Sequence, residues 1–189
     1  MVFASGSGTN AEEIFKHFAS HSQIAVKGLL TNNPDAKVIG RARNHDIPYV
    51  VFNRTEFANR DHMLKILDQW ETNAIVLAGF LWLIPLYLID RYPDNILNIH
   101  PALLPKYGGK GMYGMRVHKA VLDANEEESG ITIHLVNKEY DKGRILFQKR
   151  CQVDQTDTPE TLASKIHQLE HEYYPQVIEQ WLLRKDERI

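Results

Sequence analysis

Residues 1–10, Met-Val-Phe-Ala-Ser-Gly-Ser-Gly-Thr-Asn, decide the fold that we expect of the whole chain. Residues 1–4 predict a short strand, and residues 11–19 predict a helix because Ile14 and Phe18 recur at helical spacing. A strand, a glycine turn and a helix in this order can hold a phosphate, because glycine lets backbone N–H groups approach an anion at the helix N-terminus. The alternative is a tight turn that needs glycine only for its backbone angles.

The glycine turn favours a monophosphate over a dinucleotide. Gly6, Gly8 and Ala11 fit the dinucleotide pattern, but the next predicted strand, about residues 24–30, ends in residues 31–33, Thr-Asn-Asn. It therefore offers no acidic side chain for a ribose hydroxyl. The turn also lacks the Gly-Lys-Ser/Thr ending of a P-loop. The missing acidic side chain argues against a dehydrogenase, and the missing ending argues against a P-loop.

Strands and helices alternate along the chain. Further strands are predicted at residues 49–52, 73–78, 95–97, 131–136 and 144–153, and helices at 35–45, 55–70, 86–91, 116–124 and from 157 onward, with a kink at Pro175 and a fraying tail at 184–188. The apolar run 73–78 suits a central parallel strand covered on both faces, and the last two strands are joined closely enough to be antiparallel. We therefore expect an α/β fold: one Rossmann-like domain with a mostly parallel central sheet, antiparallel strands in the C-terminal half and helices on both faces.

Composition narrows the function classes. The chain has 189 residues, 43% of them hydrophobic and 24% charged, with a net charge of -2, which indicates neither a nucleic-acid partner nor a membrane surface. Cys151 is the single cysteine, so an internal disulfide and a thiolate metal cluster are both excluded. The chain has no apolar run of membrane-spanning length. We expect a cytoplasmic protein without a bound metal, either a monomer or a homodimer.

Asn98 and His100 are the first candidates for chemistry. They lie two apart after an apolar run and just before Pro101, so they share one face at the end of a predicted strand. An amide beside an imidazole can stabilise a developing oxyanion and move a proton. The alternative is a polar strand end whose side chains satisfy loop backbone.

Two loops are ambiguous on composition alone. Residues 79–84 carry bulky apolar side chains that can form the wall of a flat ring, or can belong to a core loop. Residues 106–114 contain four glycines, which predicts a mobile loop that is either a lid or simply solvated.

The remaining histidines give no metal site. His17, His21, His45 and His62 have no matching partner in the pattern and are expected to be solvated. His167 and His171 lie four apart on one helical face, but the HExxH pattern of zinc enzymes is absent. His134 is on a predicted strand, as a partner of the site or as a buried core residue.

Taken in order, four motifs resemble the folate-dependent formyltransferases, and among them the phosphoribosylglycinamide formyltransferases of purine synthesis. They are residues 5–10 (Ser-Gly-Ser-Gly-Thr-Asn), 77–80 (Leu-Ala-Gly-Phe), 98–105 (Asn-Ile-His-Pro-Ala-Leu-Leu-Pro) and 141–143 (Asp-Lys-Gly). The resemblance covers essentially the whole chain, and it implies one formyltransferase domain over 1–189, with a phosphate-binding half (1–97) and a catalytic and folate-binding half (98–189). Trp82 stands where many members carry arginine, and Lys142 where many carry glycine.

The resemblance assigns a role to each matching position. It implies that Asn98, His100 and Asp141 are catalytic, with His118 and His134 near the site. The other implied contacts are the substrate phosphate at Gly6, Ser7, Gly8, Thr9 and Asn10, the ribonucleotide at Glu170, and folate at Phe80, Leu81, Trp82, Leu83, Ile84, Lys138, Glu139 and Tyr140.

The implied reaction moves the formyl group of 10-formyltetrahydrofolate, a co-substrate, to the amine of glycinamide ribonucleotide through a tetrahedral intermediate. Asn98 and a protonated His100 would stabilise the oxygen of that intermediate, and Asp141 would hold His100. Hydrolysis of formyltetrahydrofolate and a non-catalytic nucleotide-binding module are the rival interpretations.

Overall fold

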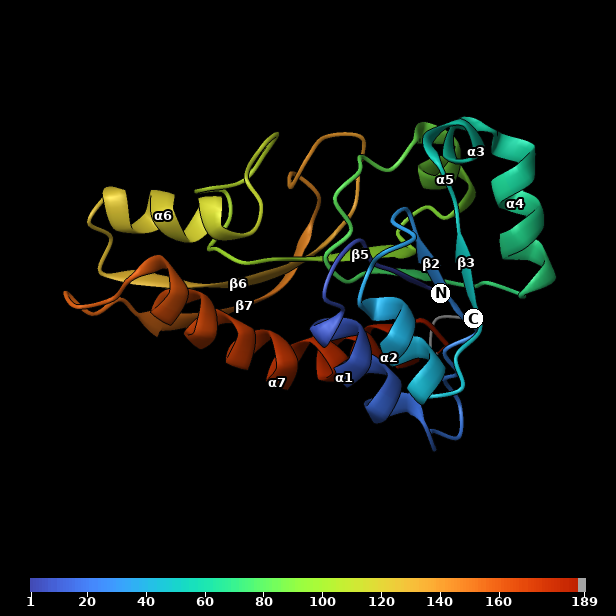
Figure 1. Cartoon of the computed structure of the whole chain (residues 1–189), viewed down its shortest axis with the longest axis horizontal. Helices are drawn as coiled ribbons and strands as arrows, with labels where there is room; N and C mark the ends of the chain where they lie inside the picture. Colours follow the sequence, from blue (N-terminus) through green and yellow to red (C-terminus); the bar gives the residue numbers. More distant parts are fainter. Residues whose placement is uncertain (187–189) are drawn as a thin grey trace.

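A seven-stranded sheet forms the centre of the computed structural model, which describes residues 1–186, and its strand order is β3-β2-β1-β4-β5-β6-β7 (Figure 1). The strands are β1 Val2–Phe3, β2 Leu29–Thr31, β3 Tyr49–Val51, β4 Ile75–Leu77, β5 Ile96–His100, β6 Glu128–Leu135 and β7 Ile145–Gln152. The helices are α1 Thr9–Phe18, α2 Val38–Asn44, α3 Arg54–Ala58, α4 Arg60–Gln69, α5 Leu86–Arg91, α6 Met115–Asp123 and α7 Pro159–Asp186.

Neighbouring strands from β3 to β5 run parallel, whereas β5 pairs with β6 and β6 with β7 in antiparallel orientation. The predicted mixed sheet is therefore confirmed. The register places Asn98 of β5 opposite His134 of β6. The antiparallel pairing thus brings two polar side chains together from positions far apart in the sequence.

Alternation along the short central strands divides the apolar side chains between two cores. Val2 and Val76 face one cluster of buried residues, and Phe3, Ile75 and Leu77 face the other. Successive strand residues point to opposite faces, so a continuous apolar run fills both. For this reason the apolar run at residues 73–78 predicts a central strand.

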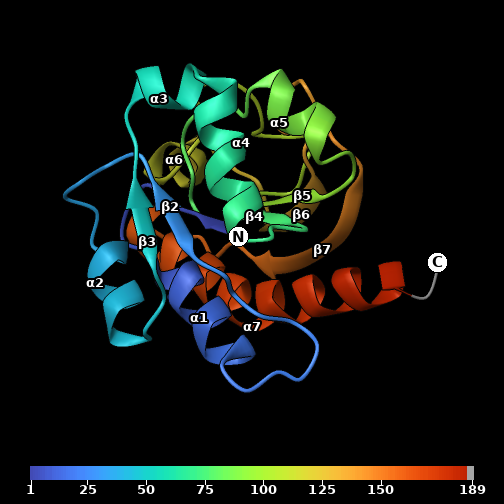
Figure 2. The ribbon, with the colours of Figure 1, turned by 90° about the vertical axis from the view of Figure 1, so that its right-hand side faces the viewer.

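Helices cover both faces of the sheet. Figure 2 shows α3, α4 and α5 on one side and α1, α2 and α7 on the other. The first core includes Phe15 of α1, Val121 of α6 and Tyr174 of α7, and the second includes Met63 of α4 and Leu88 of α5. None of the helices described is long and apolar enough to cross a membrane.

Several predicted boundaries were wrong. Residues 24–28 are not strand: Ile24 and Val26 only pack against the first core, and β2 begins at Leu29. The helix predicted over 55–70 is divided at Asn59, whose side chain accepts a hydrogen bond from the backbone N–H of His62 and caps α4. Strand β6 begins earlier than predicted. Helix α7 continues through Pro175 to Asp186, and the predicted fraying beyond that residue lies outside the described part of the chain.

Candidate active site

The order of the parallel strands reverses between β1 and β4, and the segments that follow these neighbouring strands enclose the candidate site. Such a reversal opens a crevice at the carboxyl ends of the strands. Two hydrogen bonds join the segments: Ser5 N–H donates to the carbonyl of Gly79 (3.1 Å), and Leu81 N–H donates to Ser5 Oγ (3.1 Å). The glycine turn and the apolar loop are thereby held side by side.

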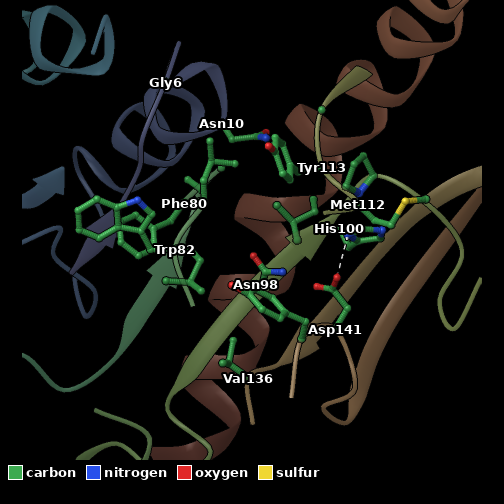
Figure 3. Close-up of a pocket in the computed structure, with 18 of the residues that line it drawn as sticks. Gly6, Asn10, Phe80, Trp82, Asn98, His100, Met112, Tyr113, Val136 and Asp141 are labelled. Carbon is green, nitrogen blue, oxygen red and sulfur yellow. Dashed lines mark ion pairs between the residues drawn. The ribbon is translucent and has the colours of Figure 1, made fainter. Parts of the chain in front are cut away.

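A cavity of about 640 Å³ lies at this crevice, which is within the usual range for small-molecule sites. It brings together almost every residue that the sequence predicted for the site, from the glycine turn, the apolar loop, β5, α6, β6, the loop after β6 and α7. Figure 3 shows part of this lining, including Trp82, Asn98 and Asp141. Lys138 is the exception, since it is exposed and does not line the cavity. Residues 79–84 line the cavity, and Phe80 and Ile84 of the same segment belong to the second core, so each of the two alternatives describes part of this loop.

His100 is fixed by contacts on both ring nitrogens. Its Nε2 lies 2.8 Å from the carbonyl oxygen of Tyr107, and its Nδ1 lies 3.6 Å from Asp141 Oδ2 (Figure 3). A carbonyl only accepts, so Nε2 carries the proton in the neutral ring and Nδ1 is left facing the carboxylate. A second proton on Nδ1 creates an ion pair with Asp141, although 3.6 Å is too long for a direct hydrogen bond.

Asn98 and Asp141 are linked through His134. His134 Nδ1 lies 2.9 Å from the carbonyl of Leu135, which sets a proton on that nitrogen. Its Nε2 then accepts from Asn98 Nδ2 at 3.1 Å and lies 3.6 Å from Asp141 Oδ1. The second N–H of the Asn98 amide stays available to a ligand oxygen. His134 is thus a partner of the site and is also buried.

In this cluster, burial and the neighbouring charges act in opposite directions on the pKa values of His100 and Asp141. Burial lowers the pKa of His100 below its ordinary value, although the Asp141 carboxylate and the Tyr107 carbonyl both act to raise it. For Asp141, burial would raise the pKa, but His134, the charge on His100 and the Gly109 N–H outweigh it and leave the pKa lowered. Asp141 is therefore a carboxylate at neutral pH, ready to pair with a protonated His100.

The loop after β6 holds Asp141 in an unusual backbone conformation, with φ at 54°. Its Oδ2 accepts the Gly109 N–H at 2.9 Å, and a Cβ added at Gly108 would lie 3.2 Å from Asp141 Cβ. Residues outside glycine rarely adopt a positive φ unless their surroundings impose it. The glycine-rich segment thus supports the carboxylate from the opposite side.

The glycine turn presents the start of α1 to the cavity. Gly8, at φ 74°, precedes the helix, and no side chain caps its first turn. A Cβ at Gly8 would lie 2.3 Å from Val38 Cγ2, so this position needs glycine for both its backbone angle and its close approach to α2. Free N–H groups at a helix N-terminus attract an anion, which agrees with a phosphate at this turn.

Glu170 of α7 meets the glycine turn through Asn10, whose Nδ2 donates to Glu170 Oε2 at 2.9 Å. Burial raises the pKa of Glu170 to about 7, although the hydrogen bond from Asn10 acts to lower it. His118 lines the same side of the cavity, and burial, with the charges of His167 and His100, lowers its pKa to about 4. This wall therefore carries a neutral imidazole and a carboxyl group that titrates near neutrality.

Sequence reasoning missed some neighbours of the site and misjudged others. His167, Tyr113 and Arg116 line the cavity but were not predicted to do so. The histidines expected to be solvated have partners in three cases: the carboxylate of Glu179 contacts His17 (2.6 Å) and His21 (3.4 Å), and that of Glu12 contacts His45 (3.7 Å), while His62 is exposed. Among the residues described, no group of three or more His, Cys, Asp or Glu is placed to hold a metal ion.

The chain is similar in sequence and in fold to known proteins. The family model described as formyl transferase matches residues 1–178. The chain is 43% identical over 183 residues to the chloroplastic phosphoribosylglycinamide formyltransferase of Arabidopsis thaliana, in an alignment that covers 94% of this chain and 63% of that protein. It thus spans about three fifths of the plant relative.

A bacterial relative and a solved structure match at nearly full length. The phosphoribosylglycinamide formyltransferase of Bacillus subtilis is 38% identical over 186 residues, which cover 96% of this chain and 93% of that protein. The crystal structure of the Bacillus halodurans phosphoribosylglycinamide formyltransferase superposes with a TM-score of 0.86 at 34% identity, and covers 96% of this chain and 93% of that one. The family match, the two relatives and the shared fold agree: the chain belongs to the formyl transferase family.

Proposed function

We propose that the chain transfers the formyl group of 10-formyltetrahydrofolate to the primary amine of glycinamide ribonucleotide, a step of de novo purine synthesis. The observation that carries the proposal is the cluster of Asn98, His100, His134 and Asp141 beside a cavity that has a glycine turn at one side and an apolar wall at another. The names of the relatives support the same substrates.

The two substrates bind at different walls of the cavity. The substrate phosphate binds the turn formed by residues 6–10, and Glu170 accepts hydrogen bonds from the ribonucleotide. The folate ring binds along residues 80–84 and 139–140. Leu81 and Leu83 line the cavity with 51% and 44% of their surface exposed, an unfavourable exposure that the face of a flat aromatic ring would relieve. We do not include Lys138, since it lies outside the cavity.

In the chemical step, the amine attacks the formyl carbon and negative charge develops on the formyl oxygen. The Asn98 amide donates its free N–H to that oxygen, and protonated His100 supplies a positive charge beside it. A C–N bond forms to the acceptor, the bond to the folate nitrogen breaks, and one proton passes from the amine to that nitrogen. No covalent bond to the protein is needed.

Asp141 acts against the burial of His100. Burial still leaves the pKa of His100 below its ordinary value, so the carboxylate 3.6 Å away increases the share of protonated imidazole and stabilises the charge once the ring takes up a proton. His134 accepts a hydrogen bond from the Asn98 amide and so fixes the orientation of that amide, while the Gly109 N–H holds Asp141. The carboxylate therefore acts on the oxygen indirectly, through the charge state of His100.

The 189 residues act as one domain, in which residues 1–97 bind the phosphate and residues 98–189 supply the catalytic groups and complete the folate site. The partners are small molecules, with no nucleic acid or membrane, and the protein acts in the cytoplasm as a monomer or homodimer. Cell fractionation tests the proposed location, because plant relatives are named as chloroplastic.

An absorbance assay for tetrahydrofolate formation tests the proposed reaction. With formyl folate as donor, product is expected to form when glycinamide ribonucleotide is added and not without it. Formate released at the same rate in the absence of the ribonucleotide indicates a hydrolase. Binding of the ribonucleotide without folate binding or turnover indicates a nucleotide-binding module.

A further inference from the structure

Tyr107 has an unusual conformation beside the candidate catalytic histidine. Its φ is 56°, in the left-handed region that bulky residues rarely adopt, and its carbonyl oxygen accepts the Nε2 proton of His100 at 2.8 Å. Such strain persists only where neighbouring contacts impose it. The question is which contacts hold Tyr107 in this position.

The side chain of Tyr107 is anchored by contacts that do not involve His100. Its hydroxyl donates to Glu126 Oε1 at 2.8 Å, and Lys106 Nζ contacts the same oxygen at 2.7 Å. The ring is half-buried and packs against the first core. The hydroxyl bond and the packing together fix the rotation of the residue, and hence the direction of its carbonyl.

The segment before Tyr107 is held just as firmly. The N–H of Leu104 donates to Thr132 Oγ1 at 3.0 Å, and its carbonyl accepts from Gln148 Nε2 at 3.0 Å. These side chains come from β6 and β7, so the antiparallel half of the sheet supports the start of the loop. The Glu126 contact supports its end, next to His100.

We infer that Tyr107 and Glu126 are positioning residues for His100: the hydroxyl anchored on Glu126 directs the Tyr107 carbonyl at Nε2 and so leaves Nδ1 for Asp141 and the substrate. The kinetic consequence of this inference rests on the proposed formyl transfer. The orientation of the His100 ring does not depend on that reaction. Neither residue needs to touch substrate. The charged and titratable groups facing His100 are Asp141, His134 and His118, and none of them replaces the Tyr107 carbonyl as the acceptor for Nε2.

Tyr107→Phe removes the hydroxyl and keeps the carbonyl and the packing. We expect its kcat to fall about tenfold to a hundredfold, because a catalytic group displaced by a fraction of an ångström loses rate of this order, while KM changes little. Glu126→Ala is expected to give the same loss, and Glu126→Gln a smaller one because its amide oxygen still accepts. Lys106→Met is the matched control, since it removes the other contact of Glu126 and keeps the hydroxyl bond.

The ring of His100 provides a second readout. In protein labelled with ¹⁵N-histidine, with His100 assigned from its absence in His100→Gln, neutral His100 of the wild type is expected as the Nε2–H tautomer. In Tyr107→Phe and Glu126→Ala it is expected to gain the Nδ1–H tautomer, and the pH profile of kcat is expected to shift. An unchanged tautomer together with unchanged kcat in both variants overturns the inference. Absence of formyl transfer in the wild type refutes the proposed function instead, and the tautomer measurement still decides the role of Tyr107.

Discussion

Replacement of Glu170 by glutamine removes a carboxyl group that α7 holds in the protein interior. Glu170 has only 6% of its surface exposed, and its single side-chain hydrogen bond, among the contacts described, comes from Asn10. Glutamine has nearly the same shape and keeps an oxygen for Asn10 to donate to. The substitution therefore isolates the cost of ionising a carboxyl group at this site.

The size of the effect follows from the raised pKa. In the folded protein the pKa of Glu170 is about 7, against an ordinary value of 4.5, so the folded state keeps its proton at pH values where the unfolded chain has lost it. Stability is therefore lost as pH rises from about 4.5 to 7. At about 1.4 kcal/mol for each unit of pKa, the loss reaches about 3 kcal/mol above pH 7.

Urea unfolding at pH 4, 6 and 8 measures this directly. We expect Glu170→Gln to be stabilised relative to the wild type by about 3 kcal/mol more at pH 8 than at pH 4. Glu172→Gln, which removes the same charge from an exposed position of the same helix, is the control and should show no such trend. A difference between Glu170→Gln and wild type that stays constant across this pH range would refute the reasoning. If Glu170 also binds the ribonucleotide, the stabilised variant is expected to have a higher KM for that substrate.

Asn98→Ala and Asp141→Ala are each expected to lower kcat by about a hundredfold or more while urea unfolding stays close to wild type, since each removes support for the charged formyl oxygen; near wild-type turnover in a folded Asp141→Ala protein contradicts the assignment. Gly8→Ala should destabilise the fold by about 1–3 kcal/mol and raise the KM for the ribonucleotide, because the added Cβ meets a valine of α2 at a positive φ. Gly6→Ala is its control, since that Cβ meets nothing within 4 Å, and equal effects on stability would count against the steric argument. Trp82 lines the cavity, so a folate analogue should quench its fluorescence, and the quenching should be lost in Trp82→Phe; quenching that persists places the ring elsewhere.

The sequence predicted the central fold well because its strongest patterns are local. The apolar run of β4 and the glycine turn after β1 both follow from the period of side chains along a strand and the needs of a tight turn. The wrong boundaries lie where apolar residues are spaced as in a strand or a helix for another reason. Ile24 and Val26 alternate like a strand but only pack against the core, and the helical pattern of 55–70 hid the cap at Asn59.

The candidate site was predictable only in part from local pattern. Asn98 and His100 share a strand face, so their spacing alone indicated a joint role. Asp141 lies some forty residues later, and only the family resemblance connected it to His100. The sequence pattern relates His167 only to His171, as a possible metal pair, although His167 lines the cavity. The contact from Tyr107 comes from a backbone carbonyl, and a main-chain atom has no signature in a sequence.

The two cores described on either side of the sheet have a consequence for substitutions near the cavity. Phe80 and Ile84 of the apolar wall pack in one core, whereas Glu170 lies on α7, which packs in the other. The two walls thus rest on different packing layers, and repacking beneath one of them is expected to leave the shape of the other unchanged.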